Sequence, residues 1–240
     1  MRFALLAVLA VACRPDMEPF TPLPGGGGVP GGTAPGSNTS TTPDANPGAI
    51  VGFVCVLTDP RDFSSCSAED LSGITVSLTG VPSVVTGSNG SFVIQRPIGT
   101  NLSFAISGSN VVPSTMALGT NPVVFAMSIQ TANTLLASNG IVVDPTQGAI
   151  LGVVAHGTTP VPLVRVVATP TGVFPDTFFS TVDDLVDWPG LSTSALGTFM
   201  VATLTPGIET LTVTPNSGVS TLIGNVPVNA GAFTFMTVQQ

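Results

Sequence analysis

Lysine is absent from this 240-residue sequence, and charged residues of every kind are scarce. Five arginines stand against thirteen acidic residues, so the net charge is −8, and charged residues make up only 8% of the chain, where about 25% is usual. Binding to a phosphate backbone requires a basic patch, so the composition excludes nucleic acid as a partner. The exposed surface must consist mainly of Thr, Ser, Asn, Gly and Pro.

The chain also has a single histidine, His156, and lacks the motifs that mark common active sites. General-base catalysis needs a nucleophile and an orienting group close to the base. The sequence contains no G-x-S-x-G elbow, no H-E-x-x-H, no Walker A loop and no G-x-G-x-x-G that opens a helix. We therefore expect no catalytic residue and no enzyme activity, and we interpret His156 as an exposed loop residue.

The N-terminus reads MRFALLAVLAVAC, with Arg2 followed by ten apolar residues, 3–12. A membrane-spanning helix needs about 20, whereas this length is typical of a signal peptide. The small residues before Cys13 resemble a bacterial lipoprotein signal. The resemblance implies removal of residues 1–12, lipidation of Cys13 and attachment to a membrane. Arg14 follows in place of the aspartate that retains some lipoproteins at the inner membrane, which favours the outer membrane or cell surface. An ordinary secretory peptide cleaved nearby is the alternative.

A tether follows at residues 13–48. Residues 22–48 contain eight glycines and six prolines and no aromatic residue. Such a composition buries too little apolar surface to offset the entropy of ordering, so we expect disorder. A flexible segment from Cys13 to Gly48 would have a reach of roughly 30–36 Å, enough to hold a folded part away from a membrane.

The rest of the chain contains a tandem duplication. GAIVGFVC at 48–55 returns as GAILGVVA at 148–155, and VVTGSNGSFVI at 84–94 returns as LSTSALGTFMV at 191–201. The last block, NPVVFAMSI at 121–129, aligns with AGAFTFMTV at 230–238. Five such blocks recur in one order, about 90 to 110 residues apart, as expected for two copies of a unit of about 100 residues.

Each copy is predicted to consist of short strands. Ile74, Val76 and Leu78 alternate with polar residues, the period-2 pattern of a strand with one buried face. Asn89-Gly90 between apolar alternations indicates a hairpin turn. Strands spaced about ten residues apart favour a β-sandwich. Only residues 129–138, between the copies, suggest a helical turn.

The order of these motifs resembles the carboxypeptidase regulatory-like domain, which has a transthyretin-like sandwich. The first copy carries the G-x-[VI]-x-G-x-V, G-[IV]-x-V and T-x-x-x-G-x-F elements, and the second departs at 161–163, where the family has a glycine before the second strand. The resemblance implies an all-β fold of two tandem transthyretin-like or Ig-like sandwiches, at 49–131 and 148–240, with a linker and lead-in strand at 132–147. A related adhesin family forms Lys–Asn isopeptide bonds, which the absence of lysine excludes.

Two cysteines remain once Cys13 is assigned to lipidation. Cys55 ends the first strand and Cys66 closes the polar loop after it. In an oxidising compartment we expect them to form a disulfide, worth roughly 3 kcal/mol. Two free thiols or a metal pair are the alternatives.

The segment FPDTFFSTVDDLVDWPG at 174–190 is an insertion in the second copy. It brings together four carboxylates and the only tryptophan: Asp176, Asp183, Asp184, Asp187 and Trp188. Carboxylates close together suit Ca²⁺, and an aromatic side chain among acids suits a glycan or a protein partner. A solvated loop whose Phe and Trp side chains cover the sandwich edge is the third interpretation.

These observations predict a non-catalytic, lipid-anchored cell-envelope protein that acts as a structural or adhesive module. Membrane attachment and a protein or glycan of the envelope are the expected contacts. The alternative is an accessory module that binds carbohydrate or peptidoglycan. Either role is expected to depend on the loops in which the copies diverge, 55–71 and 174–190.

Overall fold

The computed structural model describes residues 48–97, 102–117, 122–169 and 177–240. The predicted signal peptide at 1–12, nearly all of the predicted tether at 13–48, the lipidation site Cys13 and the acidic residue Asp176 lie outside these ranges. All of the described residues belong to one compact unit.

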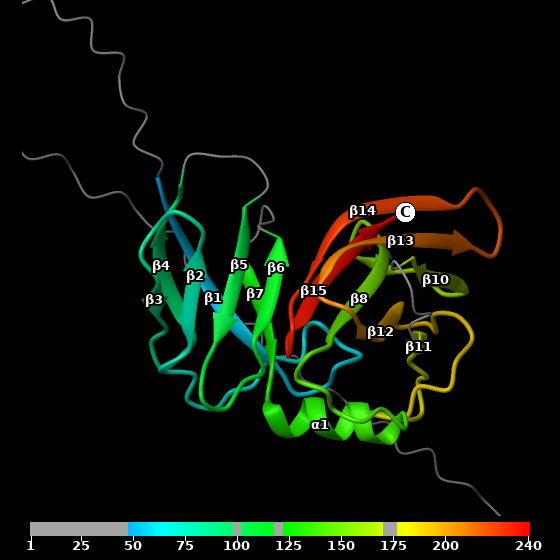
Figure 1. The fold of residues 1–240 in the computed structure, drawn as a ribbon, viewed down its shortest axis with the longest axis horizontal. Coiled ribbons are helices and arrows are strands. Elements are labelled where there is room, and N and C mark those ends of the chain that lie inside the picture. The colour runs from blue at the N-terminus through cyan, green and yellow to red at the C-terminus, as the bar shows by residue number, and fades with distance from the viewer. Residues whose placement is uncertain (1–47, 98–101, 118–121, 170–176) are drawn as a thin grey trace, which may run out of the picture. The chain divides into compact units, whose positions relative to one another are not determined.

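Within the described ranges the chain forms fifteen strands and one helix (Figure 1). In order they are β1 (Ala49–Leu57), β2 (Thr75–Leu78), β3 (Val84–Val85), β4 (Ser91–Gln95), β5 (Ser103–Ser107), β6 (Ser114–Ala117), β7 (Val123–Met127), α1 (Ile129–Ser138), β8 (Gly148–His156), β9 (Thr159–Pro160), β10 (Val164–Ala168), β11 (Thr177–Phe179), β12 (Thr198–Leu204), β13 (Gly207–Pro215), β14 (Thr221–Val228) and β15 (Phe233–Gln239).

The first copy is a sandwich. A sheet of order β4-β1-β7 packs against the β6-β5-β2-β3 part of a larger sheet. The predicted alternation of β2, and the same pattern in β5, place Val76, Leu78, Phe104 and Ile106 in the core between the two sheets. Burial of apolar side chains from both facing sheets is the main force that holds such a sandwich together.

The second copy repeats this arrangement, with β12-β8-β15 facing β10-β13-β14. Strand by strand, β1, β2, β4, β5, β6 and β7 correspond to β8, β10, β12, β13, β14 and β15. The pairings agree as well: β1 is antiparallel to β4 and parallel to β7, as β8 is to β12 and β15. Likewise β5 joins β2 and β6, as β13 joins β10 and β14. The predicted all-β fold of two sandwiches is confirmed.

Close approach of a phenyl ring to the backbone explains the glycine and phenylalanine shared by the copies. Gly52 is paired with Phe92 across β1 and β4, and Gly152 is paired with Phe199 across β8 and β12. A Cβ on either glycine would overlap the paired ring. The ring can therefore lie over the neighbouring strand only where that strand has no side chain.

A buried threonine explains the first position of T-x-x-x-G-x-F. The Oγ1 atom of Thr86 donates to the carbonyl of Leu71 at 2.5 Å and accepts from the amide of Ile74 at 3.1 Å. One repeat later, Thr193 makes the same two kinds of bond at 2.8 and 2.9 Å. Each hydroxyl satisfies backbone groups where the chain enters the second strand of its copy.

The departure at 161–163 changes the residue but keeps the backbone conformation. Gly73, directly before Ile74, has φ +83°, and Leu163, directly before Val164, has φ +59°. The left-handed region costs a residue with a Cβ about 1–2 kcal/mol. The second copy thus holds a leucine in a conformation for which the first copy uses glycine.

The last sequence block was aligned wrongly. Val123 is paired with Phe53 and Thr237 with Val153, so Val123 corresponds to Thr237, and the predicted alignment is out by five residues. The reason is that β15 begins earlier in its copy than β7 does, and its first residues pair with a second strand as well as with β8. Its residues Phe233–Phe235 pair in parallel with β6, which joins strands of both copies into one nine-stranded sheet (Figure 1).

The predicted helical turn at 129–138 is confirmed, since α1 has those bounds. Ser128 is its N-cap, and the Oγ atom of Ser128 accepts from the amide of Thr131 at 3.0 Å. Asn139 is the C-cap and Gly140 follows at φ +72°, a usual way to end a helix. The helix overlaps the end of the predicted first domain and much of the predicted linker at 132–147.

We predict that a Cβ is destabilising at both of these equivalent positions. Gly73→Ala should lower the free energy of unfolding by about 1 kcal/mol because of the left-handed backbone, since an added Cβ meets nothing within 4 Å. Leu163→Gly should exceed Leu163→Ala in stability by about the same amount, because both remove the same exposed side chain. Urea unfolding measures all three variants, and equal stability of the two Leu163 variants would contradict the strain.

Candidate functional site

A third apolar core lies between the two sandwiches and includes side chains from both divergent loops. We call this core, together with the β6–β15 pairing, the joint. Strands β8 and β12 are buried on both faces: Ile150 and Val201 point into the second sandwich, whereas Leu151 and Met200 point into the joint. Burial on two faces explains the near-continuous apolar sequence of these strands. The fully or nearly buried members of this core are Cys55, Leu57, Met127, Ala132, Leu135, Ala149, Leu151, Trp188, Met200, Ala202, Phe233 and Phe235.

The first divergent loop is closed by the predicted disulfide, Cys55–Cys66, whose Cα atoms are 4.9 Å apart. Inside it, the Asp59 carboxylate accepts from the backbone amide of Arg61 at 2.8 Å, which is the turn structure expected of an Asp-Pro sequence. The ring of Phe63 extends from this loop to Phe125 and Phe235, with ring centroids 5.0 and 6.1 Å apart. The loop therefore contacts strands of both copies.

Arg61 joins this loop to the acidic insertion. Its guanidinium is held by the Asp59 carboxylate, with a 3.0 Å ion pair. The Nη1 atom of Arg61 donates to the backbone carbonyls of Thr181, Val182 and Asp184, the last at 2.7 Å. The hydrogen bonds that the guanidinium donates to the Asp59 carboxylate are the main cause that raises the pKa of Arg61 above its ordinary value. The two loops in which the copies differ are thus bonded to each other.

Within the acidic insertion, one carboxylate is bonded to the backbone of its own loop. Asp183, Asp184 and Asp187 are exposed. The Oδ1 atom of Asp184 accepts from the amides of Val186 and Asp187, both at 3.0 Å, and these bonds lower the pKa of the carboxyl group. Across the described residues, no three His, Cys, Asp or Glu side chains are grouped so as to hold a metal ion. With Asp176 outside the described ranges, Ca²⁺ binding here stays a prediction.

Trp188 points inward. Its side chain is fully buried in the joint, and the indole Nε1 donates to the carbonyl of Leu185 at 3.1 Å. The Asn139 side chain at the end of α1 accepts from the Trp188 amide at 2.9 Å and donates to the Val186 carbonyl at 2.7 Å. The insertion is therefore fixed to the helix. Because it is buried, the indole offers no face on which a sugar could stack.

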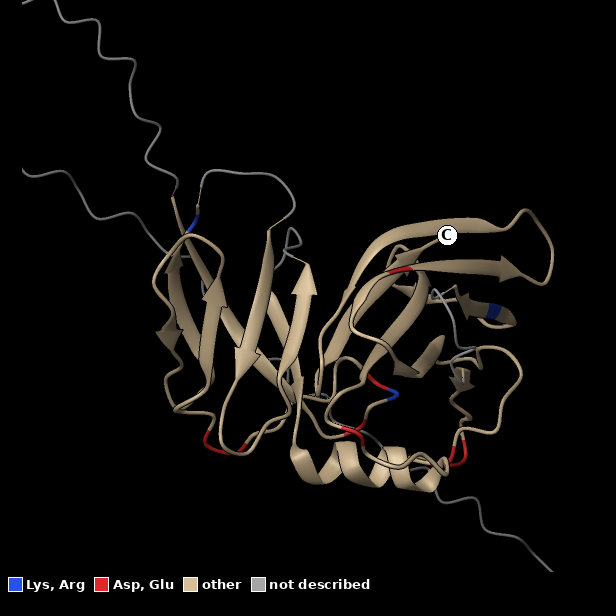
Figure 2. Ribbon diagram, viewed as in Figure 1, with Lys and Arg blue, Asp and Glu red and all other residues tan. Residues whose placement is uncertain are grey.

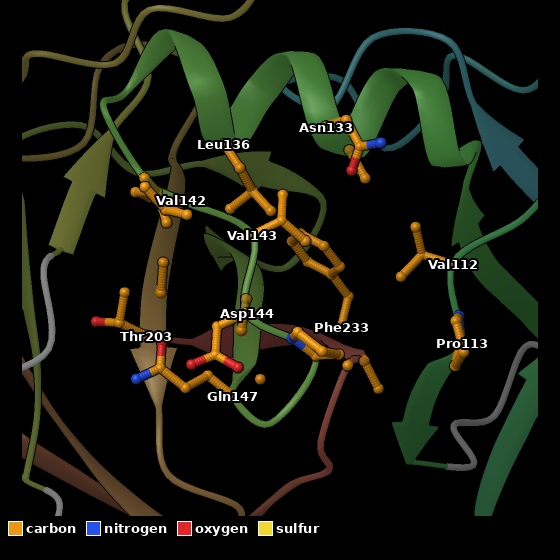
Figure 3. Close-up of a pocket in the computed structure, with 18 of the residues that line it drawn as sticks. Val112, Pro113, Asn133, Leu136, Val142, Val143, Asp144, Gln147, Thr203 and Phe233 are labelled. Carbon is orange, nitrogen blue, oxygen red and sulfur yellow. The ribbon is translucent and has the colours of Figure 1, made fainter.

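A pocket of about 230 Å³ opens beside this core (Figure 3). It lies under α1, where Leu136 and Val143 approach the ring of Phe233, with Val112 and Pro113 on the other side. Its walls are largely apolar, and small-molecule sites usually have about 300–1,000 Å³. Of the residues around it only Asp144 titrates. With one titratable residue, the lining offers no acid–base pair for catalysis. The hydroxyl of Thr146 donates to the Asp144 carboxylate at 2.6 Å and lowers the pKa of that carboxyl group.

His156 lies at the end of β8 rather than in a loop, and it is exposed. Its Nδ1 atom lies 2.6 Å from the backbone carbonyl oxygen of Gln240. The side-chain amide of Gln239 contacts the neighbouring Gly157. These contacts connect β8 to the end of the chain and bring no nucleophile to the histidine.

Sequence reasoning missed three residues at or beside the joint: Arg61 as a link between the loops, Asn139 as the attachment of the insertion, and Phe63 as a side chain packed against the core. Arg61 gave a signal, because it is one of only five basic residues and lies in a divergent loop. Asn139 and Phe63 gave none, since their partners are far away in the sequence.

One carboxyl group is buried outside the joint. Glu209 lies on β13 with only 4% of its surface exposed, and its Oε2 atom has no hydrogen-bond partner among the described residues. Burial raises its pKa above the ordinary value. A charged carboxylate without a partner opposes folding.

No family model and no curated protein matches the sequence. Among solved structures, the TIE protein of Bacillus anthracis is 11% identical, with a TM-score of 0.28. The match covers 80% of this chain and 34% of the TIE protein. A minor pilin of Streptococcus agalactiae is 11% identical over 80% of this chain and 94% of its own, with a TM-score of 0.26. Invasin, a bacterial integrin-binding protein, is 10% identical over 75% and 39%, with a TM-score of 0.18.

The match therefore spans about a third of the length of the TIE protein. All three TM-scores are well below one half, so these similarities support no inference about the function of this chain. A membrane-spanning helix of sufficient length and apolarity does not occur in the described part of the chain.

We predict that Glu209 makes stability fall as the pH rises. Because its pKa is raised in the folded state, its favourable contribution is complete below the pKa of the unfolded chain, about 4.3. The contribution is lost as the pH rises through the folded pKa. Glu209→Gln should therefore gain stability over the wild type at pH 7 but not at pH 4. Urea unfolding of both proteins at the two pH values measures this, and an identical pH dependence would refute it.

Proposed function

We propose that the chain is a non-catalytic, lipid-anchored cell-envelope protein that serves as a structural or adhesive module. The observation that carries this proposal is the use of both divergent loops. The disulfide loop and the acidic insertion bond to each other through Arg61, and both contribute side chains to the joint. In both loops, residues that distinguish one copy from the other are used for contacts between the copies.

The chemistry of the described surface supports the same role. The only histidine contacts a backbone carbonyl, and the apolar pocket has no paired titratable groups. A catalytic site needs an acid, base or nucleophile held within reach of a substrate. What the chain offers instead is two sandwiches connected by a shared sheet, a shared core and a disulfide-closed loop.

The anchor follows from the N-terminal sequence. Cleavage before Cys13 and lipidation of that residue would leave a tether rich in glycine and proline between the membrane and β1. Attachment by several acyl chains is far stronger than the marginal attachment given by one. A surface position in the envelope then places the sandwiches where a protein or glycan partner could reach them.

Binding of carbohydrate or peptidoglycan through the acidic insertion is not favoured by any observation. The one tryptophan of the chain is buried in the joint. The exposed acids of the insertion do not by themselves define a ligand.

Removal of the anchor tests this function. We predict that Cys13→Ser abolishes incorporation of labelled palmitate and moves the protein from the membrane to the soluble fraction. Arg14→Ala, the matched control, should leave both unchanged. A structural or adhesive element acts where it is anchored, so the released protein should fail to restore envelope integrity or adhesion to a deletion strain. Full restoration by Cys13→Ser would contradict the proposal and favour a freely diffusing binding protein.

A further inference from the structure

The duplication makes β14 the counterpart of β6. In the first copy Phe104 and Ile106 pair with Met116 and Ser114, and in the second copy Leu211 and Val213 pair with Ile223 and Thr221. Segment Thr221–Ile223 therefore corresponds to Ser114–Met116. In the first copy that segment is covered, because Phe233–Phe235 of β15 pairs with it.

Half of β14 is protected against such pairing. The register between β13 and β14 shifts between Glu209 and Leu211, and Asn225 has φ +59°. Pro227 follows within the strand, and its carbonyl accepts from the Thr234 hydroxyl at 2.5 Å. Bulges, prolines and covering side chains are the usual means by which a sheet edge is blocked.

The other half has none of these protections. β14 is the last strand of its three-stranded sheet (Figure 1). Within the described residues, the backbone of Thr221–Ile223 makes no hydrogen bond outside its pairing with β13. Leu222 is 69% exposed, and residues 210–240 contain no charged residue, so β14 and its turn carry no charge colour in Figure 2. An uncharged, exposed strand edge is a template for pairing with another strand.

We infer that Thr221–Ile223 pairs antiparallel with the same segment of a second copy of this chain, joining the two β10-β13-β14 sheets of a homodimer. The first copy provides the precedent, since its equivalent segment already binds a strand of another repeat unit. Antiparallel pairing about a two-fold axis is self-complementary, so one patch satisfies both partners. Two chains of net charge −8 repel each other, and this uncharged edge is a surface on which they can approach.

The pairing places Leu222 opposite Leu222 of the partner. Leu222→Lys puts two positive charges directly opposite each other, which opposes pairing, and the substitution is compatible with folding because the side chain is exposed. Leu191→Lys is the matched control, since Leu191 is an equally apolar side chain, 89% exposed, and lies outside the strands. Circular dichroism verifies that both variants are folded.

The experiment is sedimentation equilibrium of the full chain in a Cys13→Ser background. The concentration runs from about 5 to 500 µM, because small interfaces such as one between three-residue strand segments bind weakly. We expect the Cys13→Ser chain and its Leu191→Lys derivative to dimerise. Leu222→Lys should raise the dimer dissociation constant at least about tenfold. A monomer over the whole concentration range would overturn the proposal, and a strand of a different protein would then be the candidate partner for this edge. A dimer unaffected by Leu222→Lys would overturn it as well, because the interface would lie elsewhere.

Discussion

The parallel pairing of β15 with β6 is the contact on which the rest of the structure depends. It closes an edge of the first sandwich with a strand of the second and places Phe233 and Phe235 in the core between them. That core needs cover on its remaining sides, which α1, the disulfide loop and the acidic insertion supply. The duplication thus produced one folded unit whose two halves share a core.

The repeated contacts within each copy could be predicted from sequence because their signals are local. Gly152 and Phe199 belong to short motifs that recur, and the buried threonine belongs to the same motif as that phenylalanine. Strand alternation likewise located β2 and β5, and the helical turn expected at 129–138 is α1. The disulfide could be predicted because only two cysteines remained in the folded part.

The contacts of the joint could not be predicted in this way. Arg61 and Asp184 are 123 positions apart, and their hydrogen bond joins loops of different copies. Trp188 stands among acids, a context that suggests an exposed ligand site, yet Asn139 and the shared core draw it inward. The alignment of the last strand failed for the same reason, since the extra residues of β15 serve the other copy. Where the copies diverge, the changed residues serve mainly to hold the copies together.

The central claim is that the two sandwiches are energetically one unit. Trp188 is the only tryptophan and the chain has no tyrosine, so fluorescence excited selectively at the indole reports on the joint alone, while far-ultraviolet circular dichroism reports on the strands of both copies. Equilibrium urea unfolding followed by both signals tests the claim directly. The account predicts one transition with coincident midpoints. A fluorescence change complete while half of the strand signal persists would contradict it.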